Sequence, residues 1–196
     1  MEATNGLELG INSFALVSYL SGALADFLDE IRHDFAPGSR AKAHVTVLPP
    51  RPLRLPPKTG VVENAWTELK NNLSDFQPFR VELGDVEVFR LNRVIYLSVQ
   101  AGGAELQRMH DALNRGLVEF QEPFPYHPHV TIVQELVPGD VPQAAEFARW
   151  RWSEFRAPRN FLVDRLTFVQ NAIVQNTTEN SWIDLAALDL VGTVAR

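Results

Sequence analysis

Two short segments, AHVTVLPP at residues 43–50 and PHVTIVQE at residues 128–135, share the tripeptide His-Val-Thr. Their histidines, His44 and His129, are 85 positions apart. Each segment closes a similar unit, in which a short apolar strand (FALVSYL or VIYLSV) leads into an amphipathic helix and then into the His-Val-Thr strand. This repeat predicts two pseudo-symmetric lobes that meet across a groove.

The remaining pattern indicates an α+β fold with two lobes of mostly antiparallel sheet flanked by helices. We expect one bilobal domain over residues 1–196. The segment 49–60 has five prolines, so we expect neither a helix nor a central strand there. A polar turn is expected around NTTEN. The periodicities predict helices over 24–35, 62–73, 106–120 and 141–155, and strands over 13–20, 43–48, 79–89, 93–100, 127–134, 161–174 and 182–190.

Composition narrows the classes of partner. The chain has 18 Lys and Arg against 24 Asp and Glu, a net charge of −6, which argues against extended binding to duplex DNA. A short anionic ligand is compatible with that charge. Cysteine is absent, which excludes disulfides, a thiol nucleophile and cysteine-bound metals. There is no signal-peptide pattern and no apolar run near the roughly 18 residues of a membrane span. We therefore expect a cytoplasmic monomer without membrane contact.

The two His-Val-Thr strands carry the chemistry. On a strand, residues i and i+2 share a face, so His44 projects with Thr46 and His129 with Thr131. An imidazole titrates near pH 6.5, so one ring can be neutral while the other is protonated. A neutral imidazole can take a proton from a nucleophile, an imidazolium can protonate a leaving oxygen, and the hydroxyls can donate to phosphate oxygens. The pattern therefore predicts metal-independent chemistry on a phosphodiester.

These segments also resemble the two signature motifs of the 2H phosphoesterases, which include 2'-5' RNA ligases and 2',3'-cyclic nucleotide phosphodiesterases. The resemblance covers most of the chain in element order and length. It implies that His44 and His129 are the catalytic acid and base and that Thr46 and Thr131 bind the phosphate. It also implies a substrate with a 2',3'-cyclic phosphate or a 2'-5' linkage, from a nucleotide or short RNA, and no cofactor.

The sequence departs from many ligase-type members at two places. Leu48-Pro49-Pro50-Arg51 stands where those members have a Phe-Leu-Gly stretch, and Gln134 stands where they often have arginine. No nucleotide-binding loop is present, so any ligation would proceed without ATP by reversal of the phosphodiester chemistry. The subfamily and the natural substrate stay open.

Four further residues are candidates for binding substrate. Lys42 shares the strand face of His44, where it can meet a phosphate or simply be solvated. Arg51 belongs to the proline-rich segment 49–60, which is either a basic flap or a surface connector. Arg93 opens a predicted strand and can clamp phosphate or form a surface ion pair. Tyr126 can stack on a base or pack between the lobes.

Two other functions compete with this interpretation. His127 and His129 form a His-x-His pair on one strand face, and zinc could bind there with His44 or a carboxylate as a third ligand. Alternatively, the groove binds RNA or nucleotides with little turnover. The two remaining histidines, His33 and His110, fall within predicted helices, where we expect surface positions without a role.

Overall fold

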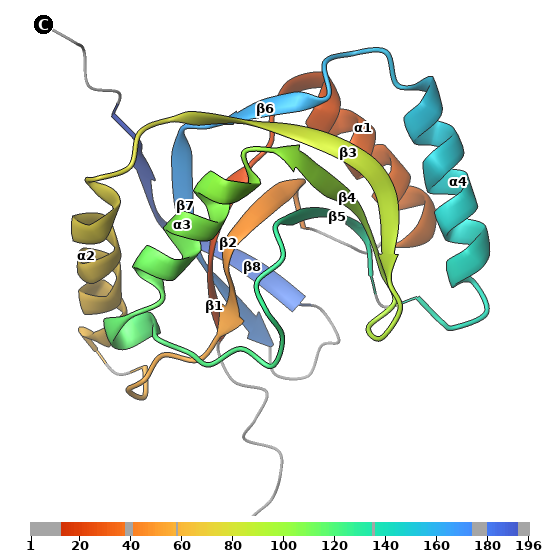
Figure 1. Ribbon diagram of the computed structural model, residues 1–196. Helices are drawn as coiled ribbons and strands as arrows, with labels where there is room; N and C mark the ends of the chain where they lie inside the picture. The colour runs from red at the N-terminus through yellow and green to blue at the C-terminus, as the bar shows by residue number, and fades with distance from the viewer. Residues whose placement is uncertain (1–12, 38–40, 58, 135, 174–179, 192–196) are drawn as a thin grey trace, which may run out of the picture.

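The computed structural model describes residues 13–37, 41–57, 59–134, 136–173 and 180–191. Four α-helices and one 3-10 turn lie among the eight strands of this part of the chain (Figure 1). No helix among these residues has the length and apolar character needed to cross a membrane. The elements are β1 (Ser13–Tyr19), α1 (Gly22–Phe35), β2 (His44–Arg51), α2 (Val61–Leu73), β3 (Phe79–Phe89), β4 (Val94–Ala101), α3 (Gly103–Leu113), the 3-10 turn η1 (Gly116–Val118), β5 (His129–Val133), α4 (Val141–Glu154), β6 (Asn160–Val163), β7 (Arg165–Ile173) and β8 (Asn180–Asp189).

The described strands form one sheet in the order β6-β3-β4-β5-β2-β1-β7-β8, and every pairing is antiparallel. The two strands that begin with His-Val-Thr, β2 and β5, are neighbours at its centre. From this centre each half continues through three further strands, β4, β3 and β6 on one side and β1, β7 and β8 on the other. The expected α+β fold with two halves of antiparallel sheet is confirmed.

The sheet is strongly curled. β6 lies at one edge of the strand order and β7 lies next to the opposite edge, yet Asp164 alone separates them along the chain. The two edges meet there, since the N–H of Leu190 after β8 donates to the carbonyl of Asp164 at 2.6 Å. The predicted strand 161–174 is therefore two strands, because β6 pairs with β3 whereas β7 pairs with β1 and β8.

Helices α1 and α3 each cross from their own half of the sheet to the other half. Helix α1 follows β1 but packs against β5, and α3 follows β4 but packs against β2. Helix α4 packs against α1, and α2 packs against α3, which gives the two groups of helices seen in Figure 1. The buried faces of α1 and α3 include Leu28 and Ile31, and Leu106 and Met109, all without exposed surface. Their 3.6-residue spacing explains why these segments are helices.

Two boundaries differ from the sequence expectation for local reasons. β2 continues through Pro49 and Pro50 to Arg51, inside the segment expected to exclude a strand. The prolines are tolerated because β2 pairs with β5 only at Val45 and Val130. Pro49 and Pro50 therefore interrupt no backbone hydrogen bonds between β2 and β5.

The third predicted helix, 106–120, ends at Leu113. The Asn114 side chain donates to the carbonyl of Phe120 at 3.1 Å and accepts from its N–H at 2.9 Å, which folds the chain back on itself. Gly116 provides the positive φ of 62° that this reversal requires. Most of the expected turn 176–180 lies outside the described residues.

Candidate active site

The register of β2 against β5 brings the two motifs together. Val45 lies opposite Val130 in this antiparallel pair, and both valines are fully buried. Because side chains alternate along a strand, the histidines and threonines on either side of these valines project to the opposite face. His44, Thr46, His129 and Thr131 all line one open groove of about 1080 Å³. The four residues predicted to carry the chemistry thus share one cavity.

Both histidines are held by the same local hydrogen bond. The Nδ1 of His44 lies 2.7 Å from the carbonyl oxygen of Lys42, and the Nδ1 of His129 lies 2.7 Å from that of His127. A carbonyl oxygen only accepts, so Nδ1 carries the proton in each ring. The Nε2 atom of each neutral imidazole is therefore the one with a free lone pair, and it is available for proton transfer.

The surroundings of the histidines favour their neutral forms. Burial lowers the pKa of His44 to about 4, and the positive charges of Arg32 and a protonated His129 act in the same direction against the Lys42 carbonyl bond. Burial also lowers the pKa of His129, with a further contribution from the nearby His127. Both rings are consequently neutral in the free protein at neutral pH, and a bound anion would favour their protonation.

Aromatic side chains pack against each ring. His44 contacts Trp182 with ring centroids 5.2 Å apart, and Tyr19 meets it edge-on at 6.2 Å. The Tyr19 hydroxyl donates to Asp184 at 2.6 Å, which fixes this tyrosine. These rings exclude water from one side of His44, which is the physical source of its low pKa.

His129 has an equivalent environment on the other half of the sheet. Phe89 and Tyr96 stack on one another at 4.0 Å and meet the imidazole edge-on at 5.0 and 5.3 Å. The Tyr96 hydroxyl donates to Glu87 at 2.9 Å. The two histidines thus share the same backbone contact and the same kind of aromatic neighbour.

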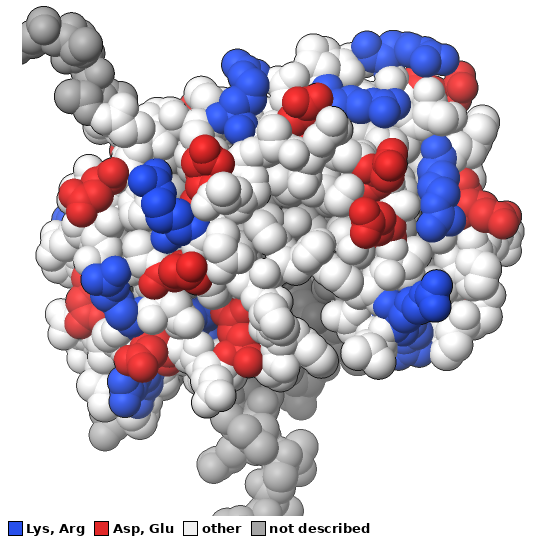
Figure 2. Space-filling view, in the orientation of Figure 1, with Lys and Arg blue, Asp and Glu red and all other residues white. Residues whose placement is uncertain are grey.

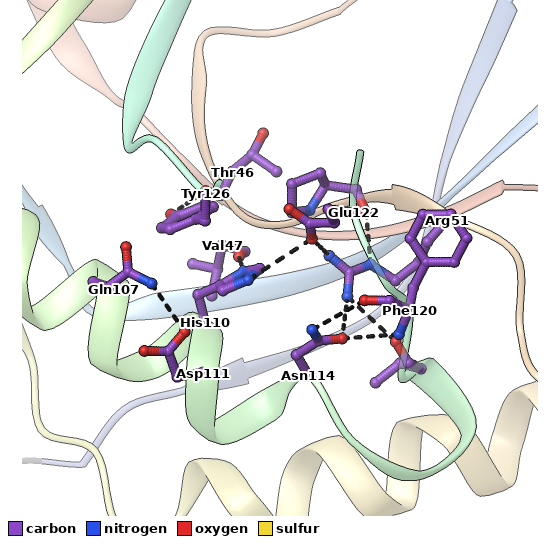
Figure 3. A network of polar contacts seen from close by, with 12 residues as sticks. Thr46, Val47, Arg51, Gln107, His110, Asp111, Asn114, Phe120, Glu122 and Tyr126 are labelled. Atoms are coloured by element: carbon purple, nitrogen blue, oxygen red, sulfur yellow. Dashed lines mark hydrogen bonds and ion pairs between the residues drawn. The ribbon is translucent and has the colours of Figure 1, made fainter. Parts of the chain in front are cut away.

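β2 and β5 pair only at Val45 and Val130, and beyond this pair side chains from other segments bind backbone carbonyls of both strands, as Figure 3 shows for β2. On β2, the Tyr126 hydroxyl donates to the Thr46 carbonyl at 2.6 Å, and Nδ1–H of His110 donates to the Val47 carbonyl at 2.9 Å. The rings of His110 and Tyr126 stack in parallel at 4.1 Å. This pair fixes the backbone of the first motif.

Arg32 has the corresponding role on β5. Its Nη2 donates to the Thr131 carbonyl at 3.0 Å and its Nε to the Ile132 carbonyl at 3.1 Å. Its Nη1 binds the Ala41 carbonyl and Asp29, each at 2.6 Å. The guanidinium therefore ties helix α1 to β5 and to the segment just before β2. Sequence reasoning did not identify Arg32.

His110 corrects an expectation. It is 6% exposed and contacts the first motif, whereas we expected a surface position without a role. A signal was present in the sequence, because residue 110 follows Met109 and precedes Leu113 by three positions on the apolar face of its helix. His33 is exposed, as expected.

Two of the four candidate substrate-binding residues lie at the groove or beside it. Tyr126 lines the groove, although its hydroxyl and one ring face are already occupied by Thr46 and His110. Lys42 lines a smaller adjoining pocket of about 330 Å³ that shares His44 with the groove. The Lys42 ammonium lies 5.4 Å from the centre of the Tyr19 ring.

The other two candidates do not line the groove. Arg51 is 1% exposed and forms a buried ion pair with Glu122 (Figure 3). It also donates to Asn114 and to the Pro49 carbonyl, both at 2.8 Å. Arg51 therefore holds the segment that contains Asn114 and Glu122 against β2, and it is not part of a basic flap. Arg93 is exposed in the β3–β4 turn with a φ of 58°, and Arg90 lines the groove in its place.

Within the described ranges, no group of three or more His, Cys, Asp or Glu residues is arranged to bind a metal ion. The rings of His127 and His129 are 6.4 Å apart. The zinc alternative thus finds no third ligand among these residues.

An antiparallel α+β fold with two equivalent His-x-Thr strands at one groove is the architecture of a 2H phosphoesterase. The chain belongs to the 2'-5' RNA ligase superfamily, whose family model matches residues 20–172. No curated protein sequence matches the chain at a significant level.

Three solved structures illustrate the likeness of fold. TT0787 of Thermus thermophilus has a TM-score of 0.63 and 16% identity over 92% of this chain and 99% of that one. LigT of E. coli in complex with 3'-AMP has a TM-score of 0.60 and 14% identity over 92% and 99% of the two chains. A further structure, described as a phosphoesterase, has a TM-score of 0.58 and 16% identity over 92% and 99%. LigT has also been crystallised with ATP and with phosphate.

Proposed function

We propose that this protein is a metal-independent phosphodiesterase that acts on 2',3'-cyclic phosphates or 2'-5' linkages of nucleotides or short RNA. The observation that carries the proposal is the equivalent setting of His44 and His129. In both rings Nδ1 is occupied by a carbonyl two residues earlier, so Nε2 is the atom left for proton transfer. Acid–base catalysis of a displacement at phosphorus needs two such groups in one cavity.

For a 2',3'-cyclic phosphate, the reaction is an in-line attack by water. One neutral imidazole accepts a proton from water as its oxygen bonds to phosphorus. The other ring, as imidazolium, gives its proton to the ribose oxygen as the bond from that oxygen to phosphorus breaks. The product is a phosphomonoester, and the sum of protons on the two histidines is unchanged. Thr46 and Thr131 donate hydrogen bonds to the non-bridging oxygens, where charge accumulates in the transition state.

The lowered pKa values fit this sequence of events. Burial keeps both rings neutral before binding, so one ring gains its proton when the negative charge of the phosphate raises its pKa. The acid is then formed only when substrate is present. Lys42, exposed beside His44, can add positive charge to the same phosphate. The nucleotide complexes of LigT support a nucleotide as the substrate class.

The test compares three single variants on a 2',3'-cyclic mononucleotide in EDTA. His44→Ala and His129→Ala should each lower kcat by roughly 10²–10⁴-fold, since each removes an acid–base group. His33→Ala, at an exposed site on α1, is the matched control and should keep the parental rate. Parental activity in a folded His44 or His129 variant would overturn the proposal. Tight nucleotide binding without turnover by the parent protein would indicate the binding-module alternative.

A further inference from the structure

We infer that the groove is built for a small ligand with a single phosphate and a flat apolar group, a mononucleotide-sized cyclic phosphate and not an extended polynucleotide. The inference rests on the proposed function and specifies its substrate class. It follows from two features of the groove, the shortage of free cations and the apolar wall beside the catalytic residues.

Few positive charges are available to a ligand. Among the described residues that line the groove, the Lys, Arg, Asp and Glu side chains are Arg32, Arg90 and Glu122. Arg32 is bound to carbonyls and to Asp29, and Glu122 is bound to a buried arginine. Arg90 makes no hydrogen bond or ion pair with any other described residue. With Lys42 in the adjoining pocket, the described part of the site offers two cations to a ligand.

The face of the molecule seen in Figure 2 does not add a basic track that could guide a long polynucleotide. Figure 2 shows Lys and Arg side chains interspersed with Asp and Glu across the visible face, without a continuous basic area. Polynucleotide affinity comes mainly from several phosphates neutralised at once. Two cations suffice for one phosphate at the catalytic histidines and leave little charge for its neighbours.

An apolar wall stands beside the catalytic centre instead. It consists of prolines from β2 and of prolines and one phenylalanine from the segment before β5, and Leu91 of the β3–β4 turn lines the same groove. Phe124 is 60% exposed and Leu91 is 85% exposed, an arrangement that offers unburied apolar surface to a ligand. The wall residues are Pro49, Pro50, Pro123, Phe124 and Pro125.

This wall is held in place before any ligand binds. The segment that carries Phe124 is anchored by the ion pair of Glu122 with Arg51 and by the Asn114 bonds to Phe120. Proline restricts the backbone on both sides of Phe124. A rigid aromatic and proline surface fits the flat face of a nucleobase.

The experiment measures kcat/KM for a 2',3'-cyclic mononucleotide and for a ten-nucleotide RNA with the same terminal cyclic phosphate, from 50 to 200 mM salt. Two cations can neutralise at most two phosphates, so the slope of log kcat/KM against log salt should be no steeper than about −1.4 for the RNA and about −0.7 for the mononucleotide, which has one phosphate. The two kcat/KM values should agree within about threefold. A preference for the RNA above tenfold, together with a steeper slope for the RNA, would overturn the inference.

A variant tests the wall directly. Phe124→Ala should raise KM for the cyclic mononucleotide at least about fivefold, the lower range for loss of one stacked base. It should leave KM unchanged for glycerol 1,2-cyclic phosphate, which has no base. Trp150→Ala is the matched control, because Trp150 is 58% exposed on α4 and does not line the groove. An unchanged KM for the nucleotide in the Phe124 variant would refute the wall as a base-binding surface.

The two levels of proposal fail in different ways. Absence of turnover with both cyclic phosphates and RNA refutes the phosphodiesterase itself. Efficient turnover that grows with RNA length and falls steeply with salt leaves the phosphodiesterase intact and refutes only the small-substrate inference.

Discussion

The hydroxyl of Tyr126 can be removed without altering the ring that stacks on His110, so Tyr126→Phe tests whether the contact to the first motif matters for catalysis. The hydroxyl donates to the Thr46 carbonyl at 2.6 Å. Because β2 and β5 pair only at Val45 and Val130, the carbonyl gains no replacement partner from β5. Losing the bond should lower the free energy of unfolding by about 0.5–1.5 kcal/mol, the usual net contribution of a hydrogen bond.

The effect on activity should exceed what lost stability explains. Thr46 is proposed to hold a phosphate oxygen, and a shift of its backbone misplaces that donor, so kcat/KM should fall roughly 10-fold or more. Urea unfolding gives the stability, and steady-state kinetics well below the unfolding transition gives the activity.

Trp152→Phe provides the comparison for Tyr126→Phe. It removes an indole donor 2.9 Å from the carbonyl of Gly84, and neither Trp152 nor Gly84 lines the groove. That variant should lose stability and keep its kcat. Equal kcat/KM in the parent and the Tyr126 variant, with the expected loss of stability in the latter, would refute the argument and leave Tyr126 a packing residue.

Four further predictions concern the histidines, the threonines and the buried arginine. Only the pair with one protonated ring reacts, and burial has lowered both pKa values, so kcat/KM should pass through a maximum below pH 6.5. The maximum of kcat should lie at higher pH, because bound phosphate favours the imidazolium. An alkaline plateau that disappears in EDTA would instead indicate a metal hydroxide. The same lowered pKa values mean that the unfolded chain binds more protons, so the free energy of unfolding should decrease as pH falls from 6.5 towards 4, which urea titrations at several pH values would measure. Thr46→Val and Thr131→Val preserve shape and delete a donor, and each should cost about 1–3 kcal/mol in transition-state stabilisation measured from kcat/KM; parental kinetics in both would make the threonines structural. Arg51→Ala leaves the carboxylate of Glu122 without its cationic partner and should lower the free energy of unfolding by about 3–5 kcal/mol. A loss below about 1 kcal/mol would contradict the importance of this ion pair.

The order of elements could be predicted from the sequence because period-2 and period-3.6 patterns are local. β3 was predicted with its observed ends, Phe79 and Phe89, and α2 to within one residue. The duplicated His-Val-Thr also predicted that two strands would present equivalent side chains. Each histidine could be paired with its threonine because a strand places residues i and i+2 on one face, and that rule needs no knowledge of tertiary contacts. The shared groove was inferred from the repeat.

The errors concern contacts between residues far apart in sequence. Arg51 lies in a basic, proline-rich segment, which by itself is typical of a surface flap. Its role depends instead on its partner Glu122, which comes 71 positions later. Arg32 lies on a helix like many surface arginines, and the carbonyls that bury it belong to β5, about 100 positions away. The break at Asp164 depends on the curl of the whole sheet. No local pattern encodes these pairings.

The crossing of α1 and α3 bears on how such a protein folds. Each lobe's central strand is covered by a helix that the other lobe supplies, so a fragment ending after β2 would contain α1 without β5 and β2 without α3. Such a fragment has no complete hydrophobic nucleus, and folding must wait until chain segments far apart in sequence have met. The two halves should therefore unfold in a single cooperative transition, and the catalytic strands between them cannot form in either half alone.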